Sequence, residues 1–171
     1  MIRKKHDRMG IGELVQIEFL YGKAYATSDW GRKNELELLG CIQKNYPIGE
    51  IVFVKGEAAT SCISEYNKLN IIIKAFRGEE VFFDLHKNEF DIKTSALQEL
   101  EFWQLPFREL FCGRSFYKFQ TALLDKDCQD TDLLLERYEA IGNQLGRFQV
   151  SVIEIHDATE AELVELTRIL N

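Results

Sequence analysis

The chain has 171 residues, of which 46 % are hydrophobic and 29 % are charged, and these proportions are ordinary for a globular domain. Two prolines and eleven glycines exclude collagen-like and proline-rich disordered classes. No apolar run approaches the roughly 20 residues that a membrane-spanning helix needs, and no apolar stretch follows the basic start as in a signal peptide. We therefore expect a cytoplasmic protein with one domain over residues 1–171, and a boundary near residue 125 is the alternative.

Charge is distributed unevenly along the chain. The formal net charge is −7, and the segment from residue 125 onward, with eleven acidic and four basic residues, carries all of it. The first 124 residues contain seventeen bases and seventeen acids, which cancel. An acidic surface repels nucleic acid and anionic membranes and accelerates association with a basic partner, so we expect no nucleic-acid or membrane partner. The alternative is that the acidic helix faces only keep the chain in solution.

The first two-thirds of the chain is predicted to be rich in strands that form antiparallel hairpins. Period-two alternation over residues 13–19 and a following turn predict a hairpin that returns through residues 23–27. The β-branched run at 69–76 predicts a strand of a second hairpin, whose other strand is 81–86. Further strands are expected at residues 35–39, 50–54 and 115–121.

Two short helices are expected within this strand-rich part. One covers residues 58–68. The other begins at Ser95, because Ser95 and Gln98 have the spacing of a capping box, and ends at residue 102 or 103. A proline at position 106 disfavours continuing that helix.

The last quarter of the chain predicts a helix, a strand and a second helix. After Asp130 the apolar residues recur at helical spacing, and Gly146 is suited to the position just after the helix. Residues 148–155 predict a strand, and a capping box from Thr159 to Glu162 opens a final helix. The sequence therefore predicts an α+β fold, with a strand-rich N-terminal two-thirds and a C-terminal helix–strand–helix.

Two pairs of an acid and a histidine are candidates for chemistry. Asp84 and His86, like Glu154 and His156, are two residues apart on predicted strands, so each pair projects to one face. A carboxylate placed in this way can orient an imidazole as a general base. The second pair with His86 could form a metal site. The alternative is the ordinary polar alternation of a strand that faces solvent, and we assign no catalytic residue, metal site or cofactor.

The four cysteines carry no metal or redox motif. No two of them form a C-x-x-C pair, which argues against a zinc knuckle or a thioredoxin-like site. A Cys–His nucleophile pair is a further hypothesis, since such partners meet in space rather than in sequence. Reduced, structural thiols are the expectation.

Aromatic residues are concentrated between positions 102 and 119, close to several arginines and lysines. Aromatic and arginine clusters are frequent at the centres of protein interfaces, so Trp103, Phe107 and Phe111 are candidate anchors for a partner. The alternative is that these rings fill the core of the domain.

The sequence near the N-terminus resembles a family of bacterial immunity proteins, immunity protein 26. Residues 11–19, Ile-Gly-Glu-Leu-Val-Gln-Ile-Glu-Phe, and residues 22–26, Gly-Lys-Ala-Tyr-Ala, resemble the opening strand and the "G-K-Y-A-Y-G" type return strand of that family. Ala24 and Tyr25 depart from this pattern, and Glu18 stands where the family has a proline. The resemblance covers about fifteen residues of the chain. It implies a protein that neutralises a toxin domain made by the same cell, and it identifies no functional residue.

Together these observations predict a non-catalytic protein-binding module, immunity- or antitoxin-like, that occludes a basic surface of a toxin or another protein. The alternative is a small enzyme or ligand-binding protein that uses the two acid–histidine pairs. The oligomeric state is left open. The candidate acidic contacts for a partner are Asp130, Asp132, Glu136, Glu139, Asp157, Glu160, Glu162 and Glu165.

Overall fold

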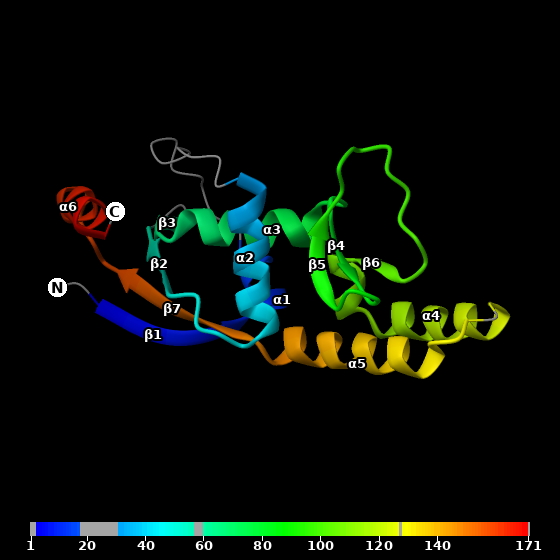
Figure 1. The fold of residues 1–171 in the computed structure, drawn as a ribbon. Coiled ribbons are helices and arrows are strands. Elements are labelled where there is room, and N and C mark those ends of the chain that lie inside the picture. Colours follow the sequence, from blue (N-terminus) through cyan, green and yellow to red (C-terminus); the bar gives the residue numbers. More distant parts are fainter. Residues whose placement is uncertain (1–2, 18–30, 57–59, 127, 171) are drawn as a thin grey trace.

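The structure is a computed structural model that describes residues 3–17, 31–56, 60–126 and 128–170. Over these residues the chain folds into helices and two separate sheets, so the predicted α+β class is confirmed (Figure 1). Six of the seven strands in the described ranges precede residue 107, and the chain ends with the predicted helix–strand–helix.

The larger sheet brings the two ends of the chain together. Its strands are β1 (Arg3–Gly10), β2 (Glu50–Lys55), β3 (Thr60–Ser64) and β7 (Gln149–His156). Their order is β1-β7-β2-β3. β7 is antiparallel to β1 and parallel to β2, and β3 is antiparallel to β2. A strand from the end of the chain therefore lies between two strands from its first third.

The smaller sheet and the helices fill the rest of the molecule. The smaller sheet is antiparallel, in the order β5-β4-β6, with β4 (Val81–Asp84), β5 (Glu89–Ile92) and β6 (Gln104–Pro106). The helices are α1 (Ile11–Leu14), α2 (Gly31–Gln43), α3 (Tyr66–Arg77), α4 (Gly113–Asp125), α5 (Thr131–Arg147), α6 (Glu160–Leu170) and the 3-10 helix η1 (Phe107–Phe111).

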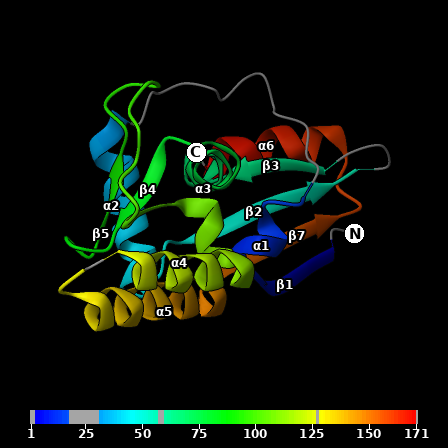
Figure 2. The same cartoon turned by 90° about the vertical axis from the view of Figure 1, so that its right-hand side faces the viewer.

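The helices occupy distinct places around the sheets. α3 lies between the larger and the smaller sheet, and α4 and α5 run side by side and extend past the smaller sheet at one end of the molecule (Figure 1). α6 lies at the other end and packs beside β3 (Figure 2). The hairpin of α4 and α5 is thus the part that projects furthest from the larger sheet.

Alternating residues of β7 divide between two apolar clusters. Val150 and Val152 face the main core, which includes α3, α5 and the smaller sheet. Ile155, together with the partly buried Ile153, faces a smaller cluster that Leu163 and other residues of α6 close. β7 is therefore covered on both faces, as an interior strand of a sheet requires.

The strongest strand prediction, at 69–76, is wrong, because these residues lie in α3. Leu69 and Ile72 are fully buried, and most of the other apolar side chains of α3 are buried as well. A short apolar run does not distinguish a buried strand from a buried helix, although the exposed residues Asn70, Lys74 and Arg77 of α3 have helical spacing. The strand at 81–86 is present as β4, but it pairs with β5 and β6 instead.

Three other strand predictions fail for the same reason. Residues 35–39 lie in α2 and residues 115–121 lie in α4. In α4 the buried side chains, Phe119 and Leu123, are four residues apart, which is a helical spacing. The first part of the predicted strand at 13–19 lies in α1 and a following turn, and the rest of that hairpin falls outside the described residues.

The two short helices were also placed wrongly. Residues 60–64 form β3, and the helix begins only at Tyr66. Residues 95–103 form no helix. Instead the Gln98 side-chain oxygen accepts hydrogen bonds from the backbone N–H and the hydroxyl of Thr94, at 2.7 and 3.0 Å, so it holds a turn.

The C-terminal predictions are confirmed almost throughout. The strands predicted at 50–54 and 148–155 are present as β2 (Glu50–Lys55) and β7 (Gln149–His156), and α5 buries the predicted stripe of Leu134, Tyr138, Ile141 and Leu145. At the start of α6, the backbone N–H and hydroxyl of Thr159 donate to Glu162 Oε2 at 2.8 Å, as the capping box predicts. Gly146 is not the terminating residue, because α5 continues to Arg147.

The burial of α3 leads to a prediction for stability. Ile72 is 0 % exposed, so Ile72→Ala leaves a cavity and is expected to lower the free energy of unfolding by about 2–5 kcal/mol. Ile169 of α6 is 66 % exposed, and Ile169→Ala is expected to cost less than about 0.5 kcal/mol. Urea denaturation of both variants measures the difference. Equal losses would contradict the buried position of α3.

Candidate functional site

The Asp84 carboxylate holds a turn and does not orient a histidine. Its Oδ1 accepts hydrogen bonds from the backbone N–H groups of His86 and Lys87, both at 3.0 Å, and its Oδ2 accepts one from Gln104 Nε2 at 2.9 Å. Burial opposes ionisation of Asp84, but these hydrogen bonds outweigh it and lower the pKa of the carboxyl. His86 lies beyond the end of β4, where its exposed ring packs edge-on against Trp103.

Glu154 and His156 do share one face of β7. Glu154 is 6 % exposed. Its Oε1 lies 2.8 Å from Lys55 Nζ on β2, and its Oε2 lies 3.5 Å from His156 Nε2. Lys5 of β1 is the cross-strand neighbour of Glu154. The hydrogen bond from Lys55 lowers the pKa of Glu154 despite burial, and the charges of Lys55 and Lys5 act in the same direction. The carboxylate therefore links β7 to β2 through an ion pair, and the charge of Lys5 on β1 favours the same ionised form.

The two acid–histidine pairs do not form one site. Asp84 belongs to the smaller sheet and Glu154 to the larger one. Over the described residues, no group of three or more histidine, cysteine and acidic side chains is close enough to hold a metal ion. The hypothesis of a metal site that includes His86, Glu154 and His156 is therefore wrong.

The cysteines also lack a general base. Burial raises the pKa of the Cys62 thiol to about 12, which makes it a poor nucleophile. Cys112 is exposed before the first turn of α4, and hydrogen bonds from the backbone and side chain of Ser115 lower the pKa of its thiol. None of the hydrogen bonds between described residues joins a cysteine to a histidine, so a Cys–His pair has no structural support.

The aromatic residues between 102 and 119 mostly fill the core. Phe107 is 0 % exposed, so it cannot anchor a partner and that prediction is wrong. Phe111 is half-buried, with its ring centroid 5.3 Å from that of Phe107 and 5.4 Å from that of Phe76. Trp103 is half-buried between His86 and Phe102. The alternative interpretation, that these rings are core side chains, describes them better.

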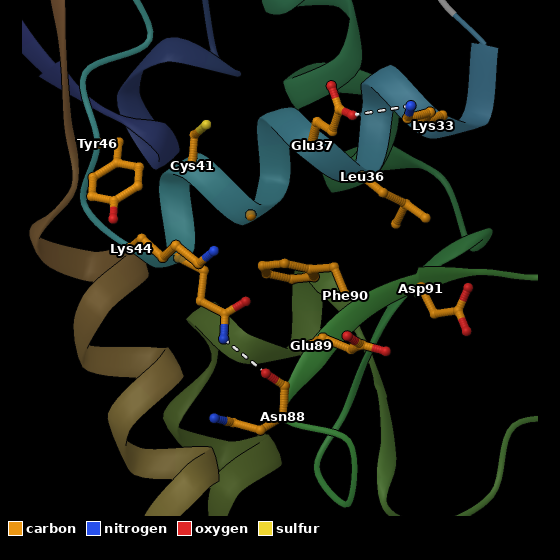
Figure 3. A pocket seen from close by; sticks show the side chains of 12 residues that line it. Lys33, Leu36, Glu37, Cys41, Lys44, Tyr46, Asn88, Glu89, Phe90 and Asp91 are labelled. Carbon is orange, nitrogen blue, oxygen red and sulfur yellow. Dashed lines mark hydrogen bonds and ion pairs between the residues drawn. The ribbon is translucent and has the colours of Figure 1, made fainter.

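A groove of about 890 Å³ lies between α2 and the edge strand β5 (Figure 3). The Gln43 side chain crosses it to donate a hydrogen bond to the Asn88 carbonyl at 2.9 Å. Its wall includes both lysines and acids, and Tyr46 at its rim is 56 % exposed. Its lining residues include no histidine.

The end of the α4–α5 hairpin carries a second exposed surface, which we call the acidic tip. We define it by seven exposed residues: Leu124, Asp125, Asp130, Leu133, Asp132, Glu136 and Glu139. On α5 the acids at 132, 136 and 139 have helical spacing and lie opposite the buried stripe. Leu124 is 84 % and Leu133 is 41 % exposed. None of the ion pairs within the described ranges involves an acid of this tip.

The two bases near the acidic tip are engaged by the protein itself. Arg137 donates hydrogen bonds of 2.7 Å to the carbonyl oxygens of Leu85 and His86, at the end of β4. The ammonium group of Lys126 lies 4.3 Å from the centre of the Phe102 ring, a cation–π contact. Neither base forms an ion pair with a carboxylate of the tip, and the five acids of the tip outnumber the two bases, so the tip is net negative.

The remaining candidate acids lie elsewhere and are partly occupied. Asp157 pairs with Arg3 at 3.2 Å, and Glu162 caps α6. Glu160 and Glu165 are exposed on α6, which lies at the opposite end of the molecule from the acidic tip (Figure 1). The structure therefore divides the eight predicted acids between two surfaces. The sequence does not predict the acidic tip as one surface, because the alternation at residues 115–121 indicates a strand where the structure has α4.

No family model, no curated protein and no solved structure matches this chain. Within the described ranges, no helix combines the length and the apolar character that crossing a membrane requires.

The buried Glu154 leads to a prediction for pH dependence. Because its pKa is lowered in the folded state, its contribution to stability is present above its ordinary pKa, near 4.5, and is lost as the pH falls through the folded-state value. Glu154→Gln is expected to cost about 1 kcal/mol at neutral pH, and the difference from the parent chain shrinks in acid. Denaturation curves at several pH values measure this.

The matched control for that prediction is Glu165→Gln on the exposed face of α6. It removes the same charge without breaking a buried contact, so little change is expected at any pH. A cost of Glu154→Gln that stays constant down to about pH 2 would contradict the ionic role of this residue.

Proposed function

We propose that this protein is a non-catalytic module that binds a basic protein and covers part of its surface, as immunity proteins and antitoxins do. One observation carries the proposal: the carboxylates of the acidic tip face solvent, while Arg137 and Lys126 are engaged by the protein's own groups. The negative field is thereby concentrated at the end of a projecting hairpin. Such a field accelerates encounter with a positively charged partner.

The exposed leucines of the acidic tip supply apolar contact area, which the charged side chains do not provide. Interfaces combine an apolar centre with a polar rim, and Leu124 and Leu133 lie at the same end of the hairpin as the acids. Burying these side chains against a partner removes apolar area from water and lowers the dissociation rate. The acids then set the rate and orientation of docking, and the leucines prolong the complex.

The most specific form of the proposal is neutralisation of a toxin in the cytoplasm. Proteins that act on nucleic acids present basic surfaces, and an acidic tip that covers such a surface blocks access to the substrate. The charge of the tip supports this form. The resemblance at the N-terminus adds no structural support, because Ile11–Leu14 is a helix and not the first strand of a hairpin.

The experiment is capture of a partner with the purified full chain as bait, from an extract of the source organism. We expect one basic protein at about 50 mM NaCl and its loss at about 500 mM, where the Debye length is only a few ångströms. Its association rate with the purified chain should fall at least about tenfold over the same range. Absence of any basic partner at either salt concentration would contradict the proposal.

Matched charge reversals then locate the contact. The double variant Asp132→Lys with Glu136→Lys should lower the association rate about tenfold or more. Glu160→Lys with Glu165→Lys on α6 makes the same change in net charge at the other end of the molecule (Figure 1) and should change the rate much less. Equal effects of both variants would show that net charge, and not the acidic tip, drives binding.

A further inference from the structure

β1 is an edge strand with one unpaired side. In the order β1-β7-β2-β3 it pairs with β7 over its full length from Arg3 to Gly10, and among the described residues with no other strand. The residues from Arg3 to Arg8 are all exposed. An edge strand presents N–H and C=O groups to which another extended chain can add as a further strand.

Two hydrogen bonds identify which backbone groups face the free side. The N–H of Arg8 donates to Asp7 Oδ1 at 2.8 Å, and the N–H of Gly10 donates to Glu13 Oε2 at 2.9 Å. These two groups therefore point away from β7. In an antiparallel pair, alternate residues direct their backbone groups to the same side, so the N–H and C=O of Lys4 and His6 also face the free edge. In the described ranges no side chain occupies those N–H groups.

The side chains around this free edge are basic on one face of β1. Arg3 and Lys5 lie on the other face, where Arg3 pairs with Asp157 at 3.2 Å and Lys5 with Asp7 at 2.9 Å. Lys4 and Arg8 share the opposite face, and in the described ranges no ion pair involves either of them. This concentration of positive charge contrasts with the net charge of −7 for the whole chain.

The charges and the backbone geometry select the kind of partner. A second copy, pairing antiparallel through the same groups, places Lys4 opposite Arg8, and like charges directly opposite destabilise a sheet. A phosphate backbone accepts hydrogen bonds from N–H groups but offers no donor to the free C=O groups of the strand. An extended acidic peptide satisfies both the backbone groups and the charges.

We infer that the free edge of β1 around Lys4 and His6 binds an extended acidic segment of a partner protein, which adds to the larger sheet as a fifth strand. This surface is independent of the acidic tip. It has the opposite charge, and it lies at the opposite end of the molecule (Figure 1). The protein thus presents two docking surfaces for partners of opposite charge.

A synthetic peptide of alternating Glu and Val, about seven residues long and capped at both ends, tests the inference with the full chain. Fluorescence anisotropy measures its binding. His6→Pro removes one outward N–H and leaves pairing to β7 intact, because edge strands tolerate proline on their free side. His6→Ala keeps that N–H and is the matched control. We expect His6→Pro to weaken binding about tenfold and His6→Ala to leave it unchanged.

Amide hydrogen exchange on the unmodified chain gives a readout that needs no variant. The bound peptide should slow exchange at Lys4 and His6 specifically. Lys4→Glu with Arg8→Glu should abolish binding, whereas Lys33→Glu on α2 with Lys44→Glu in the turn after it should not. Asp132→Lys with Glu136→Lys should leave peptide binding unchanged, which separates this test from that of the acidic tip.

Three results would overturn the inference. The first is equal binding of a peptide of alternating Glu and Pro, which cannot form a ladder. The second is equal affinity of the His6→Pro and His6→Ala variants, which would leave only charge attraction. The third is unchanged exchange at both amides in the presence of saturating peptide.

Discussion

The insertion of β7 between β1 and β2 is the interaction on which the rest of the structure depends. Because β7 is parallel to β2, the chain between them must cross over, and that crossover contains β3, α3, the smaller sheet, α4 and α5. α5 leads into β7 through the buried Phe148. The seventeen residues of α5 span about 25 Å. The acidic tip is therefore held at a fixed distance from the larger sheet by one helix that is continuous with its central strand.

The same strand explains why acid–histidine spacing does not mean catalysis here. Glu154 is buried on β7 beside Lys55, and a one-residue slip of register would move it to the opposite face of the sheet. Its ion pair therefore favours one register of the three strands that meet there. Asp84 has an analogous role, since it closes the turn between β4 and β5. Both buried carboxylates are satisfied by structural contacts.

The sequence predicts well those elements whose helical spacing is accompanied by a start signal. α5 shows the helical spacing of its buried stripe and α6 a capping box, and both signals are readable from neighbouring residues. It fails at α3, where the apolar run at 71–73 imitates a strand although Asn70, Lys74 and Arg77 are exposed at helical spacing, and at α4, where Phe116, Tyr117 and Phe119 imitate the alternation of a strand. The acidic tip is formed by the ends of both α4 and α5. Because the sequence predicts a strand in place of α4, it indicates only the part of the tip that lies on α5. The basic character of β1 is visible in the sequence, but its free edge requires the strand order.

The fold places the acidic tip at one end of the molecule and the basic edge strand β1 at the other (Figure 1). The central claim is that the α4–α5 hairpin is the surface that a basic partner covers. Hydrogen exchange of the purified complex, compared with the free chain, tests it most directly. The account predicts protection confined to residues 121–126 and 128–139 at the tip. Protection in the groove between α2 and β5, with none at the tip, would contradict it.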